Sequence, residues 1–261
     1  VFSLPAGTPV IAGAADMACG ALGICVNSPG DTAVTLGTSA TFLTAAHAPS
    51  AVGRGQITWH LHAVPDCYYA LGSHFNGGLA LNWFVSQFSE DGSISYELSD
   101  RLAALAEKIP NGRNPVLNLP FFVGSGTPYF DSSDAAAFLG VSQSCRRGEL
   151  FKSILEGVAL NLLQTLNIFE ELHHAPLSPI SLGGGGVKVA GWSQIITDVF
   201  GRRTRIIRQA DASTVGACIL GGYGAGIFRD MAEAARHTFE VVAENDPDPS
   251  AHQKYLQIHR L

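Results

Sequence analysis

The chain has 261 residues, of which 46% are hydrophobic and 15% are charged. This composition supports one large core or two small ones and excludes a disordered chain. The 16 Lys and Arg side chains stand against 22 Asp and Glu side chains, a net charge of −6, and their dispersal excludes an extended nucleic-acid-binding surface. No apolar stretch approaches the roughly 18 residues of a membrane span. We therefore expect a cytoplasmic protein that binds neither nucleic acid nor a membrane, with its five cysteines reduced.

Asp16 is the only charged residue between Val1 and Gly30. It lies within residues 11–26, a run of small and apolar side chains that we expect to be mostly buried. A carboxylate in such surroundings is costly unless it is paired, hydrogen-bonded or held at a solvent-filled cleft. Two compatible interpretations stay open. Asp16 caps a helix that starts at Met17 and accepts bonds from its first-turn N–H groups, or it is a catalytic base at a cleft.

The next segments predict two pairs of strands followed by a helix. Residues 31–37 and 41–44 are β-branched runs joined by a tight turn at Gly37-Thr38-Ser39-Ala40, and residues 57–63 and 67–71 form a second pair. Residues 78–88 then have helical spacing. His60 and His62 share one strand face, but further ligands at suitable spacing are missing from the sequence, so we expect no metal site there.

The second half of the chain alternates helices and strands. Residues 89–147 are rich in Ser, Pro, Asn and Gly and predict an insertion or cap region with one helix at 96–108. Residues 149–174 repeat apolar side chains at helical spacing, and we expect Glu156 within them to have a structural role. A strand at 179–182, a helix at about 190–200, a strand at 204–207 and a helix at about 212–227 follow. The acidic residues 244–249 predict a linker to a terminal helix within 245–261.

This order of elements predicts an α/β fold with a mixed sheet flanked by helices. Strands that end in glycine allow backbone N–H groups to approach an anion, and the hydroxyl groups of Thr38 and Ser39 can add donors. An ordinary hairpin explains Gly37 equally well. The four glycines at 183–186 are more specific, because each glycine costs about 0.5–1 kcal/mol of backbone entropy relative to alanine. Close packing of a helix on a strand is the alternative. Together with Asp16, these turns suggest a nucleotide site with one carboxylate as base.

Five segments resemble the FGGY family of carbohydrate kinases, which belongs to the actin-like, ribonuclease H-like ATPases. Residues 136–157 match that family's C-terminal signature at every defined position, and residues 7–16 are similar to the segment that carries its catalytic aspartate. The other similar segments are its phosphate-binding turn (36–39), a stretch of ATP contacts (72–83) and its adenosine turn (184–192). The resemblance covers the C-terminal lobe of a two-lobe kinase over residues 1–261 and lacks the N-terminal lobe. The chain starts at Val1 without an initiator Met, so we expect an upstream part.

The resemblance implies a role for each matching residue. Asp16 is the catalytic base, and Met17, at a position that is commonly polar in the family, lies beside the sugar. The ATP-binding residues are Gly37, Thr38, Ser39, Gly78, Asn82, Gly184, Gly185 and Gly186.

The resemblance also implies a function, which is transfer of a phosphoryl group from ATP with Mg²⁺ to a ketose or polyol, with xylulose favoured. Glycerol, gluconate, ribulose and fuculose stay open as substrates. A non-catalytic actin-like ATP-binding switch or sensor is the alternative class of function. We expect the isolated lobe to be inactive without its N-terminal partner lobe, and a homodimer is also compatible with the resemblance.

Overall fold

The core of the molecule is a mixed sheet of seven strands in the order β3-β4-β2-β1-β7-β8-β9. The computed structural model describes residues 4–208 and 211–260. Strands β1, β7 and β8 are parallel to one another, and the remaining pairs are antiparallel. The strands of this sheet are β1 (Thr32–Leu36), β2 (Ala40–Ala46), β3 (Thr58–Leu61), β4 (Tyr68–His74), β7 (Ile180–Gly183), β8 (Thr204–Arg208) and β9 (Glu240–Asn245). A separate small sheet pairs β5 (Leu117–Leu119) with β6 (Ala137–Leu139).

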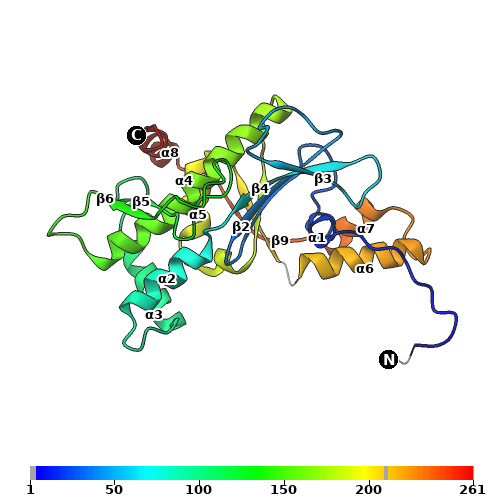
Figure 1. Cartoon of the computed structure of the whole chain (residues 1–261), viewed down its shortest axis with the longest axis horizontal. Helices are drawn as coiled ribbons and strands as arrows, with labels where there is room; N and C mark the ends of the chain where they lie inside the picture. The colour runs from blue at the N-terminus through cyan, green and yellow to red at the C-terminus, as the bar shows by residue number, and fades with distance from the viewer. Residues whose placement is uncertain (1–3, 209–210, 261) are drawn as a thin grey trace.

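Helices cover both faces of the large sheet (Figure 1). One face carries α2 (Gly78–Phe88), α3 (Tyr96–Ala106), α4 (Arg147–His173), α5 (Trp192–Phe200) and α8 (Pro249–Ile258). The opposite face carries α1 (Asp16–Gly23), α6 (Ala212–Gly224) and α7 (Met231–Thr238). A short 3₁₀ helix, η1 (Gly185–Lys188), links β7 to α5.

The alternation of side chains along the strands explains why helices pack on both faces of the sheet. On β1, Val34 and Leu36 are buried in the large core beneath α4, whereas Ala33 is buried against α1. On β2, Phe42 lies in the large core and Leu43 lies on the α1 face. Because both faces are covered, these strands are apolar on both sides.

Helix α4 crosses the large core and is buried over most of its length. Its Glu156 is 5% exposed and accepts a hydrogen bond of 2.7 Å from the hydroxyl of Tyr255 on α8. Burial raises the pKa of Glu156. Lys152, one turn earlier, donates to Asn111, which in turn donates to Asp198 of α5. These bonds join α4 to α5 and α8, and the bond from Tyr255 to Glu156 is of the kind expected for a structural residue.

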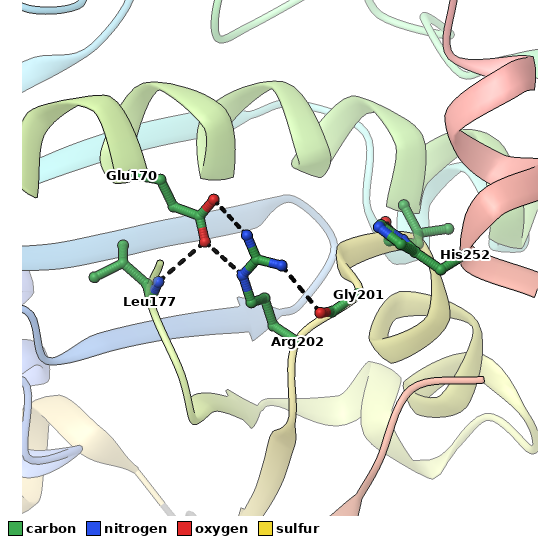
Figure 2. Close-up of polar contacts among 6 residues, drawn as sticks. Glu170, Leu177, Gly201, Arg202 and His252 are labelled. Carbon is green, nitrogen blue, oxygen red and sulfur yellow. Dashed lines mark hydrogen bonds and ion pairs between the residues drawn. The ribbon is translucent and has the colours of Figure 1, made fainter. Parts of the chain in front are cut away.

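The C-terminal end of α4 is tied to the loop between α5 and β8 by a bidentate ion pair (Figure 2). Arg202 donates from Nε and Nη2 to the carboxylate of Glu170, at 2.7 and 2.9 Å. The same carboxylate accepts from the N–H of Leu177, and Nη1 of Arg202 donates to the carbonyl of Gly201. The side chains of Arg202 and Glu170 are only 28% and 19% exposed. Loss of one partner would leave a poorly solvated charge.

We expect Arg202→Met to lower the free energy of unfolding by about 1–3 kcal/mol, measured by urea titration. Arg203→Met is the matched control. Arg203 pairs with Asp246, but their side chains are 53% and 74% exposed, so the control should change stability by no more than about 1 kcal/mol. Equal losses of stability from the two substitutions would contradict a stabilising role of the Arg202–Glu170 ion pair.

The structure confirms most predicted elements and corrects two expectations. The predicted strand pairs, the helix at 78–88, the long helix and the later β-α-β-α order are all present. The acidic segment at 244–249 is only partly a linker, because Glu244 and Asn245 belong to β9, which pairs with β8 at the sheet edge. The helix α7, the strand β9 and the small sheet of β5 and β6 were not predicted. Residues 18–26 are buried apart from the half-buried Gly23, as expected, but residues 12–15, which precede α1, and Asp16, its first residue, are exposed.

None of the helices among residues 4–208 and 211–260 has the length and apolar character that a bilayer crossing requires. In the same part of the chain, no three His, Cys, Asp or Glu side chains come together as metal ligands.

Candidate nucleotide site at one edge of the sheet

Both glycine turns lie at the same edge of the large sheet. Strands β1 and β7 are parallel, with Thr35 opposite Gly183, so the turn after β1 and the glycines after β7 leave the sheet side by side. Strand β8 ends at this edge too, and α6 begins a few residues later. In open α/β sheets, ligands bind outside the carboxyl ends of parallel strands.

The turn between β1 and β2 supports the first residues of α2. The N–H of Gly78 donates to the carbonyl of Gly37 at 2.7 Å, and the N–H groups of Gly77 and Leu79 donate to the carbonyl of Thr38 at 3.0 and 2.9 Å. A Cβ atom at Gly77 would lie 2.8 Å from the carbonyl carbon of Ser39. Glycine at this position therefore permits the close approach of helix and turn.

The β1–β2 turn presents free hydrogen-bond donors. Gly37, Thr38 and Ser39 are exposed. Gly37 uses its N–H to bond the carbonyl of Ser39 at 2.9 Å, but within the described residues the N–H groups of Thr38 and Ser39 donate to no protein acceptor. Their two hydroxyl groups also have no protein partner there. A tight turn with successive unused N–H groups is a typical anion-binding concavity.

The glycines after β7 differ in their reasons for being glycine. Gly184 has a φ of +85°, and a Cβ atom there would lie 2.5 Å from the carbonyl oxygen of Leu36. At Gly186 a Cβ atom would meet the side chains of Leu36 and Trp192 at 2.7 and 2.8 Å. At Gly185 a Cβ atom would have no neighbour within 4 Å, and the residue is exposed. Close packing thus explains Gly184 and Gly186 but leaves Gly185 without an explanation inside the chain.

The side chain of Trp192 supports this turn from the core side. Its ring is fully buried, and Nε1–H donates to the carbonyl of Leu155 on α4 at 3.1 Å. A Cβ atom at Gly186 would lie 2.8 Å from this ring, so the glycine turn lies close over a side chain that is bonded to α4.

Asp16 is the first residue of α1 and its side chain is exposed. The N-cap position belongs to Ala15, and the only hydrogen bond that the carboxylate accepts in the described residues comes from the adjacent N–H of Met17, at 2.7 Å. The prediction of Asp16 as the N-cap is therefore wrong. The helix starts one residue earlier, which leaves Asp16 in the first turn, where a negative charge is favourable, with a free carboxylate oxygen.

The backbone of Asp16 joins α1 to the start of α6. The hydroxyl of Ser213 donates to the carbonyl of Asp16 at 3.0 Å, and the side chain of Asp211 caps α6 by accepting from the N–H of Thr214. The two helices cross so closely that a Cβ atom at Gly216 would lie 1.9 Å from the carbonyl oxygen of Cys19. The positive ends of α1 and α6 thus meet beside the end of β8.

The carboxylate of Asp16 also acts on the sheet face beneath α1. Burial raises the pKa of Tyr69 on β4, and the negative charge of Asp16 raises it further. Met17, the next residue, is half-buried and packs against the apolar cluster beneath α1. Its side chain is therefore partly engaged in packing.

The remaining site residue, Asn82, lies one turn after Gly78 on α2 and is half-buried. The structure thus brings Gly37–Ser39, Gly78 and Gly184–Gly186 together around the end of β1. Asp16 lies at the α1–α6 junction, and no hydrogen bond between described residues joins its carboxylate to the glycine turns.

Gly77 and Ser213 were missed by the sequence analysis. A glycine pair before a predicted helix could have indicated Gly77, whereas the role of Ser213 depends on a helix crossing.

A buried histidine ends the strand that leads into α2. His74 is 1% exposed, and its two ring nitrogens contact Asn161 and Thr165 at 3.1 and 2.9 Å. Burial lowers the pKa of this imidazole from about 6.5 to about 3. Because the pKa in the folded state is below that in the unfolded state, the unfolded chain takes up the proton first, and stability falls as the pH drops from about 6.5 towards 3.

We expect His74 to cost roughly 2 kcal/mol of stability between about pH 7 and pH 5. His74→Gln keeps one acceptor and one donor but cannot titrate. Urea unfolding of both proteins at the two pH values measures the effect, since all other groups are shared. An equal loss of stability in both proteins would show that burial does not lower the pKa of His74.

Comparisons with known proteins agree with this architecture. The family described as "FGGY family of carbohydrate kinases, C-terminal domain" matches residues 32–225. The xylulose kinase of Bacillus subtilis is 30% identical over 254 residues, which cover 97% of this chain and 50% of that protein. The gluconokinase of the same organism is 28% identical over 225 residues, or 84% of this chain and 44% of that protein.

A solved structure gives the same result for the fold. The xylulose kinase from Rhodospirillum rubrum has a TM-score of 0.87 to this chain at 27% identity, and the match covers 98% of this chain and 51% of the other. The chain therefore spans about half the length of the relatives that it matches. It belongs to the FGGY family of carbohydrate kinases and corresponds to the C-terminal domain of that family.

Proposed function

We propose that this chain is the nucleotide-binding C-terminal lobe of an ATP-dependent sugar kinase. The observation that carries the proposal is the meeting of two glycine turns at one sheet edge, with unused N–H groups at Thr38 and Ser39 and a bare backbone at Gly185. Glycine at 185 lowers the stability of the chain without serving its packing, which is understandable if a ligand approaches the backbone there.

The proposed roles are those that the resemblance to the family implies for these residues. Gly37, Thr38 and Ser39 hold the terminal phosphates of ATP through N–H and hydroxyl donors, as a phosphate needs. On either side of that turn, Gly78 with Asn82 and Gly184 with Gly185 and Gly186 shape the nucleoside pocket. Mg²⁺, bound with ATP, neutralises phosphate charge.

Asp16 is the proposed base. Phosphoryl transfer needs alignment, charge neutralisation and a group that takes the proton of the attacking hydroxyl. Asp16 has an exposed carboxylate with an oxygen free to accept that proton, and α6 fixes its backbone through Ser213. Met17, beside it, is the proposed neighbour of the sugar, where an apolar side chain offers a contact surface and no hydrogen bond.

The proposed acceptor is a ketose or polyol, with xylulose first, because xylulose kinases are among the relatives that match nearly the whole chain. Relatives also include a gluconokinase. We further propose that an N-terminal lobe, which the length of the relatives suggests, presents the sugar opposite Asp16. The domain assignment within this lobe, with residues 89–147 as a cap and 245–261 as a tail, belongs to the same proposal.

A panel of ketoses and polyols tests this function. With the full-length protein, we expect saturable, sugar-dependent ADP release, highest with xylulose, measured in a coupled assay. Residues 1–261 alone should release no ADP, because the acceptor is not presented. Slow ADP release that is independent of every sugar would instead support the alternative, an actin-like ATP-binding switch. Sugar-dependent release by the isolated lobe would contradict the need for a second lobe.

A further inference from the structure

Three hydroxyl side chains form a row across the sheet beside the candidate site. Thr35 on β1 is opposite Thr41 on β2, and Thr41 is opposite Ser73 on β4. Directly opposite residues in antiparallel strands have Cβ atoms about 4.5–5.5 Å apart. The row lies one residue pair, Leu36 and Ala40, away from the β1–β2 turn, and Thr35 is also opposite Gly183 at the start of the second glycine turn.

The row lies on the face of the sheet that carries α1. Side chains alternate along a strand, so Thr35 shares a face with Ala33, and Thr41 shares it with Leu43. Ala33 and Leu43 are buried against α1, whereas Thr35, Thr41 and Ser73 are each half-exposed. Helix α1 therefore leaves these hydroxyl groups open, and its own N-terminal residue is Asp16.

The three hydroxyl groups have no protein partner. In residues 4–208 and 211–260, no hydrogen bond involves the Oγ atoms of this row, and Ser73 is held only through its backbone, by Thr127. Threonines at the opposite end of the same strands behave differently. Thr32 and Thr44 are buried and bond to each other at 3.1 Å, and Thr44 also contacts His173 at 2.9 Å. The sheet thus saturates its interior hydroxyl groups and leaves this row free.

We infer that Thr35, Thr41 and Ser73 bind the phosphoryl group while it moves from ATP to the sugar. The inference rests on the proposed function and adds three residues to it. The row lies next to the β1–β2 turn, whose N–H groups are the proposed phosphate donors, and on the sheet face that carries α1, whose first residue is the proposed base Asp16. Hydroxyl groups donate to phosphate oxygens without adding charge, and they hold a developing charge well when they are already in place.

The chemical step balances without a further reactant. The sugar hydroxyl oxygen forms a bond to the γ-phosphorus as the bond to the β,γ-bridging oxygen breaks. Asp16 takes the hydroxyl proton, and ADP leaves with the electron pair of the broken bond. Thr35, Thr41 and Ser73 donate to the equatorial oxygens of the group in transit, so their contribution is greatest when the group has left ADP.

The test uses the full-length protein with Thr35→Val, Thr41→Val or Ser73→Ala. For each variant we expect kcat to fall by about threefold to tenfold while the Kd for MgADP is unchanged. The Kd for MgADP with aluminium fluoride, which imitates the phosphoryl group in transit, should rise by the same factor as kcat falls. Thr44→Val is the matched control, because it removes a hydroxyl from the same strand. It should lower the melting temperature and leave kcat unchanged.

Two results would overturn the inference. One is an unchanged kcat in all three variants when Asp16→Asn is inactive, which would leave the proposed function standing without the hydroxyl row. The other is an equal weakening of MgADP binding with and without aluminium fluoride. That result would mean that the three hydroxyl groups only help to shape the nucleotide site and do not bind the phosphoryl group in transit. If the wild-type protein shows no sugar-dependent ADP release, the proposed function fails, and this inference fails with it.

Discussion

Asp16→Asn in the full-length protein should lower kcat by about 10²–10⁴-fold, the usual contribution of a general base. The Kd for MgATP should stay within about twofold, because in the proposed site the glycine turns, and not this carboxylate, hold the phosphates. Asparagine has nearly the same shape, and its side-chain oxygen can still accept from the N–H of Met17, as Asp16 does at 2.7 Å. It cannot take up the proton of the sugar hydroxyl.

Steady-state kinetics and calorimetric titration with MgATP separate the two effects. Asp91→Asn is the matched control, since Asp91 is exposed in the loop after α2 and accepts only from Ser93 among the described residues. The control should keep its turnover. If Asp16→Asn kept nearly all of its turnover, the role of Asp16 as base would be refuted.

The second large effect is expected from Gly185→Val, which should weaken MgATP binding by at least about tenfold, or about 1.4 kcal/mol. A side chain at this position meets open space in the protein, so the melting temperature should stay close to that of the wild type. The loss of affinity would come from the ligand alone, because the valine would occupy the volume that the nucleotide needs.

Gly184→Ala provides the contrast. Here φ is +85°, and a Cβ atom would lie 2.5 Å from the carbonyl oxygen of Leu36. We expect a loss of stability of at least about 2 kcal/mol that urea unfolding would detect without any nucleotide. A Gly185→Val protein that bound MgATP as tightly as the wild type would remove the strongest argument for a nucleotide at this edge.

Elements with a regular pattern could be predicted from the sequence. The helix at 78–88 and the long helix of α4 have apolar side chains at helical spacing, and β1 and β2 are β-branched runs around a tight turn. Strand β9 could not be predicted in the same way. It lies at the sheet edge with Glu240 to Glu244 exposed, so its sequence lacks the alternation of a half-buried strand. Its acidic residues suggested a linker instead.

The candidate site could be predicted residue by residue but not as an arrangement. Composition indicated the glycines at 37 and 183–186, because bare backbone is costly. Their meeting depends on the order β2-β1-β7, which no local pattern encodes. The distinction between Gly184, which packing requires, and Gly185, which it does not, also exists only in three dimensions. The position of Asp16 was misjudged by one residue, since the sequence does not show that Ala15, which has no capping side chain, occupies the N-cap position of α1.

The rigidity of the site follows from its supports. The β1–β2 turn is bonded to the first residues of α2, and the second turn rests on Trp192, which is bonded to α4. Sites held by packed elements keep their geometry, so little conformational entropy is lost when the ligand binds. Only Asp16 depends on a helix crossing, through the bond from Ser213. In this arrangement, different parts of the sheet edge position the proposed base and the turns proposed to bind phosphate.

The central claim is that the nucleotide phosphates and the base meet at the carboxyl edge of β1 and β7. A crystal structure of the full-length protein with a non-hydrolysable ATP analogue, Mg²⁺ and xylulose tests it most directly. We expect phosphate oxygens on the N–H groups of Thr38 and Ser39, and the carboxylate of Asp16 within about 2.6–3.2 Å of a sugar hydroxyl. A nucleotide bound elsewhere, or a carboxylate of Asp16 turned away from the sugar, would contradict the account.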